Sequence, residues 1–148
     1  MTATIAGTAQ TFNVSPLAIS VSNGGLTMVS IEGFSSNSST TESLAIAWTS
    51  TTPGLTFGTG TYYDTVTSYA TIGTFVPSVS QSYVSGSGVT GIAAGSGVTV
   101  TNHLKIIITA VDSTSVKGTF SGDFYYMGDI TGAVKTITNG DFDVPWKK

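Results

Sequence analysis

The sequence predicts an all-β fold of antiparallel strands, and three observations support this prediction. Apolar and polar side chains alternate with a period of two, most clearly where Val116, Phe120 and Phe124 share one face. Turn residues separate the alternating runs, and no segment shows the helical period. We therefore expect about ten strands, mainly in a meander, forming a β-sandwich or an up-and-down β-barrel. Alternation leaves both architectures open, since each buries one face of every strand.

The chain is expected to form one domain over residues 1–148, with helix content near zero. A length of 148 residues fits the size of a single domain. Charged residues make up 9% of the chain, but 40% hydrophobic content supplies a core.

The first half of the chain contains five expected strands, separated by turn signals. Gly7 bends the first pair, Asn23-Gly24-Gly25 predicts a tight hairpin, and Pro53-Gly54 marks a turn. A polar loop is expected over Ser35–Glu42. The strands are expected at residues 2–5, 10–14, 17–21, 26–34 and 43–51.

The second half is less regular in its middle and clearest at its end. Gly86–Gly97 is rich in glycine and is expected to be a long loop or a loose edge strand. Tight turns are expected at Asp112–Ser115 and at Asn139-Gly140. Strands are expected at residues 58–63, 68–76, 79–85, 98–112 (bent near Asn102-His103), 116–126 and 141–146, with Pro77 between the second and third of these.

Charge and composition exclude several classes of partner. The net charge is −3, and all five cations are lysines, scattered except for a pair at the end of the sequence. A nucleic-acid groove or a basic membrane-binding surface is therefore not expected. No apolar run reaches the length of a transmembrane segment. The absence of cysteine excludes disulfides and thiolate chemistry.

The titratable residues do not predict an active site. Asp123, Asp141 and Asp143 fall on the polar side of alternating strands, so we interpret them as solvent-facing. His103 is the single histidine, which rules out a metal site built on several histidines. No Gly-x-Ser-x-Gly motif precedes an expected helix. We therefore expect no catalytic residue, no metal, no cofactor and no enzymatic activity.

Tyrosines are the best candidates for a binding site. Tyrosine rings stack on sugars and donate hydrogen bonds, although the same residues are also good strand formers. Trp48 and Trp146 fall on apolar faces and are expected in the core. The candidate ligand-binding residues are Tyr62, Tyr63, Tyr69 and Tyr83 in the irregular middle, and Tyr125 on the polar side of its strand.

Two runs near the end of the chain, ITAVDSTSVKGTFSG and TITNGDF, form a distinctive pattern, and weaker matches lie in TATIAGTAQTF at the start and around Gly60-Thr61-Tyr62 and Tyr83. In these segments the sequence resembles a family of small secreted lipoproteins of unknown function that is common in Bacteroidetes. The resemblance implies the family's fold and its export, with lipid anchoring in a full-length precursor, and it carries over no catalytic residue. The family's lipobox cysteine has no counterpart in this sequence.

We therefore expect a non-enzymatic domain that is secreted or displayed at the cell surface and binds a glycan, peptide or small molecule. The alternative is a structural or assembly module, such as an adhesin, surface-layer or appendage subunit, that pairs through its edge strands. The hydroxyl-rich, charge-poor composition fits an extracellular location for both.

Overall fold

The computed structural model describes residues 1–36 and 42–147, which form eleven strands and one helix. The predicted all-β class is confirmed. In chain order the elements are β1 (Thr2–Ile5), β2 (Thr8–Thr11), β3 (Val14–Asn23), β4 (Leu26–Phe34), β5 (Ser43–Ser50), β6 (Gly60–Tyr63), β7 (Ala70–Ser78), β8 (Gln81–Gly86), α1 (Ser87–Ser96), β9 (Lys105–Val111), β10 (Ser115–Tyr126) and β11 (Val134–Lys147).

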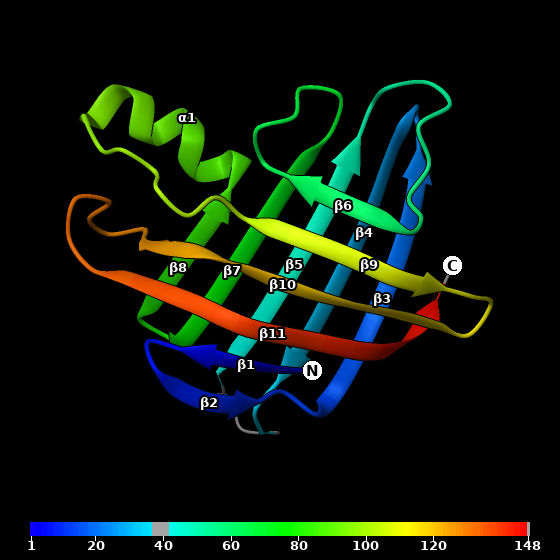
Figure 1. Cartoon of the computed structure of the whole chain (residues 1–148), viewed down its shortest axis with the longest axis horizontal. Helices are drawn as coiled ribbons and strands as arrows, with labels where there is room; N and C mark the ends of the chain where they lie inside the picture. The colour runs from blue at the N-terminus through cyan, green and yellow to red at the C-terminus, as the bar shows by residue number, and fades with distance from the viewer. Residues whose placement is uncertain (37–41, 148) are drawn as a thin grey trace.

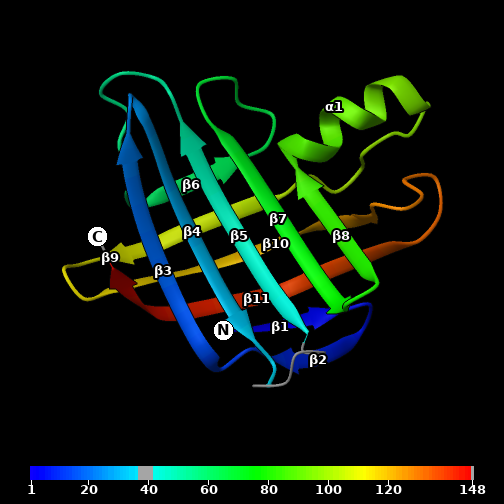
Figure 2. The same cartoon turned by 180° about the vertical axis from the view of Figure 1, so that it is seen from behind.

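The strands form two layers that cross each other (Figure 1). One layer has the order β3-β4-β5-β7-β8, and the other has the order β2-β1-β11-β10-β9-β6. β8 pairs with β10 and β3 pairs with β11, so seven of the described strands close a ring around the core. Figure 2 shows the first layer in front and α1 at one corner.

The strand pairing is antiparallel, as predicted, with one exception among the described pairs. β11 pairs in parallel with β3, through Trp146 opposite Ala18 and Lys147 opposite Ile19. β11 also pairs with β1 and with β10. β11 is therefore held between β1 and β3, from the beginning of the sequence, and β10, which directly precedes it in chain order.

Several predicted turns are confirmed. Gly24 and Gly25 form a two-residue hairpin loop, and both have positive φ angles (59° and 88°), as the turn that matches strand twist requires. The β9–β10 turn is closed by Asp112, whose Oδ1 accepts hydrogen bonds from the Thr114 backbone N–H at 2.7 Å and the Ser115 backbone N–H at 2.8 Å. Residues 37–41 of the predicted polar loop lie outside the described residues.

The core lies between the two layers and is built from the apolar halves of the alternating strands. Trp48, Phe75 and Phe124 are at most 2% exposed, and the predicted core position of Trp48 is confirmed. Trp146 is half-buried and packs against the same core. Burial of this apolar surface, at roughly 25 cal/mol per Å², is the main force that stabilises the fold.

Three expectations about local structure are wrong. Gly86–Gly97 contains α1 instead of a loop or strand, because Val89 and Ala93 pack onto the outer surface of the sheet. Asn139-Gly140 lies within β11 instead of in a turn. The strand expected from Val98 begins only at Lys105, and residues 97–104 form a connecting segment (here the 97–104 segment) that crosses over β10.

Candidate binding groove

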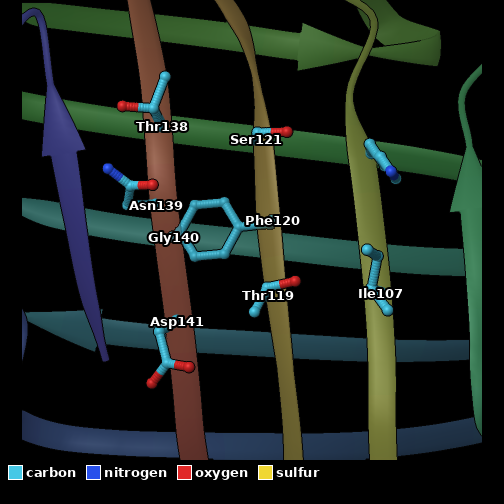
Figure 3. A pocket seen from close by; sticks show the side chains of 9 residues that line it. Ile107, Thr119, Phe120, Ser121, Thr138, Asn139, Gly140 and Asp141 are labelled. Atoms are coloured by element: carbon cyan, nitrogen blue, oxygen red, sulfur yellow. The ribbon is translucent and has the colours of Figure 1, made fainter.

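A groove crosses the outer face of the layer formed by β11, β10, β9 and β6. It consists of two hollows of about 550 Å³ and 480 Å³, which share Lys105, Ser121 and Thr138 as lining residues. We call the first hollow 1, the second hollow 2, and the pair the outer-face groove. Figure 3 shows hollow 1, with its side chains carried by neighbouring strands.

A β-bulge in β11 shapes hollow 1. Phe120 pairs with Gly140 and Gly122 pairs with Ile137, so Thr138 and Asn139 together lie opposite Ser121. The extra residue breaks the alternation, and both Thr138 and Asn139 are exposed and line the hollow. Asn139 has a φ of 50°, a left-handed conformation that asparagine tolerates better than most residues.

Gly140 makes room for the Phe120 ring at the base of hollow 1. A Cβ atom at this position would lie 2.5 Å from both the Phe120 ring and the Phe120 carbonyl oxygen. The ring therefore lies between β10 and β11, beside Gly140 (Figure 3). Side chains of Thr119, Asp141 and the apolar Ile107 complete the lining. The hollow thus offers hydroxyl, amide and carboxylate groups around a small apolar floor.

Hollow 2 lies between β11 and the 97–104 segment, with Tyr63 and Thr65 at its far side. Thr101, Asn102 and His103 of that segment line it. The Lys105 ammonium lies 5.8 Å from the centroid of the Tyr63 ring. A cation at this distance from an aromatic face is attracted by the ring, which helps to position the lysine.

Asp123 fixes the 97–104 segment to the sheet. Its side chain accepts hydrogen bonds from Thr136 Oγ1 (2.7 Å) and Asn102 Nδ2 (3.0 Å), with Thr101 Oγ1 at 3.4 Å. The backbone N–H of Asp123 also donates to the Asn102 carbonyl at 2.9 Å. The interpretation of Asp123 as solvent-facing is therefore wrong: the residue is on the outer face but only 5% exposed. Asp141 and Asp143 are exposed, as predicted.

His103 is held by a buried carboxylate. Its Nδ1 lies 2.9 Å from Oδ1 of Asp64, whose side chain is fully buried. Among the described residues, the imidazole is the one ion-pair partner of this carboxylate, although neither Asp64 oxygen nor His103 Nδ1 has a hydrogen-bond partner. Within the described residues, no group of three or more histidine and carboxylate side chains gathers where a metal ion could bind.

The five candidate tyrosines do not form one surface. Tyr62 and Tyr69 contact each other, with ring centroids 5.4 Å apart, and both pack against the core, where Trp48 is their neighbour. The Tyr62 hydroxyl donates to the Gly58 carbonyl at 2.8 Å. Tyr63 is 40% exposed and is the single candidate that lines the groove.

Tyr83 and Tyr125 lie away from the groove and are buried. Tyr83 is 5% exposed and packs between Phe75 and Tyr126 in the core. Tyr125 is on the polar side of β10, as predicted, but α1 covers it and leaves 4% exposed. Burial and the nearby Asp123 carboxylate raise the pKa of the Tyr125 hydroxyl, and a hydrogen bond with the Thr101 backbone partly opposes this rise. Tyr125 lines a separate hollow of about 320 Å³ together with Val84 and Met127, so neither Tyr83 nor Tyr125 belongs to the outer-face groove.

The groove residues were missed because strand alternation marks them simply as outward and polar. The Asn139-Gly140 pair inside an otherwise regular strand was the available signal, since such a pair marks either a turn or a bulge.

The helix α1 is too short to span a membrane, and no other helix occurs in the described residues. The chain matches no protein-family model, no curated protein and no solved structure.

Proposed function

We propose that this domain is an exported, non-enzymatic binding module that holds a glycan in the outer-face groove. The observation that carries the proposal is the bulge in β11, which turns Thr138 and Asn139 toward the same hollow. A regular strand presents one outward residue in every two, whereas this bulge presents two consecutive residues, Thr138 and Asn139, opposite Ser121. A local irregularity that gathers polar groups in a hollow is typical of a binding site.

The chemistry of the groove supports a polyhydroxylated ligand. Hydroxyl and amide groups both donate and accept hydrogen bonds, as sugar hydroxyls require. Ile107 offers an apolar surface to the C–H face of a sugar ring, and the exposed ring of Tyr63 is placed to stack on a second one. The groove runs across four strands, and this length suits an oligosaccharide better than a single small molecule.

Export is supported by composition and by the resemblance to secreted lipoproteins. The surface is rich in hydroxyl groups and poor in charge, since 9% of residues are charged. We propose that the domain is secreted or displayed at the cell surface, where polysaccharides are available as ligands.

The assembly alternative has less support. The open edges of the described sheet are β2 and β6, and each has four residues. Very short edge strands limit pairing with another chain. Light scattering after size exclusion is expected to give a monomer at all concentrations, whereas concentration-dependent polymers would favour the assembly module.

A glycan array followed by calorimetry tests the binding proposal. Asn139→Gly removes the amide and keeps the left-handed backbone, and Thr138→Val removes a hydroxyl at almost constant volume. Losing two hydrogen bonds of about 1 kcal/mol each is expected to weaken binding by roughly tenfold or more. Thr74→Val makes the same change on the other layer and is expected to leave binding unchanged. Equal affinity of all variants, or no glycan bound at all, would refute the proposal.

A further inference from the structure

The outer-face groove contains an ammonium group without a counterion. Lys105 lines both hollows. In the described part of the chain, the ion pairs are Lys117 with Asp143 at 2.8 Å and His103 with Asp64 at 2.9 Å, and neither involves Lys105. The Lys105 ammonium instead lies over the Tyr63 ring. Lys105 therefore has its charge available to a ligand at the point where the two hollows meet.

The carboxylates near Lys105 are placed unevenly along the groove. Hollow 2 has no aspartate or glutamate among its lining residues, and it includes His103 beside Lys105. Asp123 and Asp64 are buried behind this hollow and are engaged by Thr136 and His103, respectively. Asp141 is exposed and lines hollow 1 alone. Among the described lining residues, the groove thus has a free ammonium group where its two hollows meet and a single carboxylate, which lies on the hollow 1 side.

We infer, resting on the proposed function, that the glycan carries a carboxylate that binds Lys105 in hollow 2. The ligand is then a polysaccharide containing uronic acid, with neutral sugar hydroxyls bound by Asn139 and Asp141 in hollow 1. A charged donor and a charged acceptor form a stronger hydrogen bond than a neutral pair, so this one contact discriminates between acidic and neutral sugars. The Asp141 carboxylate repels a second carboxylate on the hollow 1 side, and this fixes the direction in which the chain lies.

The same charges argue against a densely charged polyanion. The protein carries a net charge of −3, and the groove supplies one free ammonium group among the described residues. Polyanions such as nucleic acids need many basic contacts along their backbone. One acidic group per bound segment, surrounded by hydroxyls, matches the groove better.

Short oligomers of galacturonate and of mannuronate, each compared with its fully methyl-esterified form, test this inference by calorimetry on the full chain. The ester keeps every hydroxyl and removes the charge. Lys105→Gln keeps a polar side chain of similar length, and Lys147→Gln, at the end of β11 and outside the groove lining, is the matched control. Thermal unfolding of each variant verifies that the fold is retained.

The expected result is that one acidic oligomer binds at least about tenfold more tightly than its ester, because hydrogen bonds to charged groups contribute about 1.5–3 kcal/mol. Lys105→Gln is expected to abolish this difference, and Lys147→Gln is expected to preserve it. Equal binding of acid and ester, or binding of neutral glycans alone that still depends on Thr138 and Asn139, would overturn the inference and leave the proposed function intact. Absence of binding to every glycan would overturn both.

Discussion

Replacement of Asp123 by asparagine is expected to destabilise the fold by about 3 kcal/mol. The carboxylate is buried and accepts short hydrogen bonds from Thr136 at 2.7 Å and Asn102 at 3.0 Å, whereas the Thr101 contact at 3.4 Å is too long to contribute much. A hydrogen bond to a charged group contributes about 1.5–3 kcal/mol. Asparagine keeps one acceptor oxygen, loses the charge, and turns an NH₂ group toward a donor. One charge-assisted hydrogen bond is therefore lost, and the new NH₂ group is buried without an acceptor.

Urea unfolding measures this change, and Asp143→Asn is the matched control. Asp143 is on the neighbouring strand, its side chain is 58% exposed, and its ion pair with Lys117 lies at the surface. Solvent screens an exposed pair of this kind, so the control is expected to leave the free energy of unfolding nearly unchanged. Thr136→Val removes the 2.7 Å donor, and its effect is expected not to add to that of Asp123→Asn. Equal unfolding free energies for the two aspartate variants would refute the claim that Asp123 anchors the 97–104 segment.

Two further predictions concern a glycine and a turn. Gly140→Ala is expected to cost about 1–3 kcal/mol in urea unfolding, because the new Cβ meets Phe120 at 2.5 Å, whereas Gly95→Ala, in the open space around α1, is expected to stabilise the protein by about 0.5–1 kcal/mol; the opposite order would contradict this reasoning. Hydrogen bonds from the Thr114 side chain and the turn backbone hold the pKa of Asp112 well below its ordinary value. A carboxyl group whose pKa is lower in the folded state stabilises the fold above its unfolded pKa, near 4, and loses this contribution as the pH falls through its folded pKa. The stability difference between wild type and Asp112→Asn, measured from pH 7 down to pH 2, is therefore expected to shrink toward the acid end, and a difference independent of pH would contradict the prediction.

The sequence predicted the strands well because alternation reports directly which face of a strand is apolar. Leu44, Ile46 and Trp48 of β5 are buried, as their spacing predicts. The hairpin at Gly24-Gly25 was also predictable, since its loop requires two positive φ angles. These features depend on local backbone geometry, which neighbouring residues largely determine.

The candidate site was harder to predict because alternation does not report what covers the outer face. Asp123 and Tyr125 point outward, as their positions in β10 require, but the 97–104 segment and α1 bury them. Asn139-Gly140 can adopt left-handed angles in a turn or in a bulge, and the choice depends on the pairing of β11 with β10. Both outcomes follow from tertiary contacts, which no short stretch of sequence contains.

The position of β11 has a consequence for how the domain folds. This strand is the last in chain order, yet it pairs with β1, β3 and β10. The ring of strands therefore cannot close during synthesis until β11 has left the ribosome, and its contacts with β1 and β3 span most of the chain. Contacts between distant segments slow folding, because the entropy of closing long loops is lost before the contacts form.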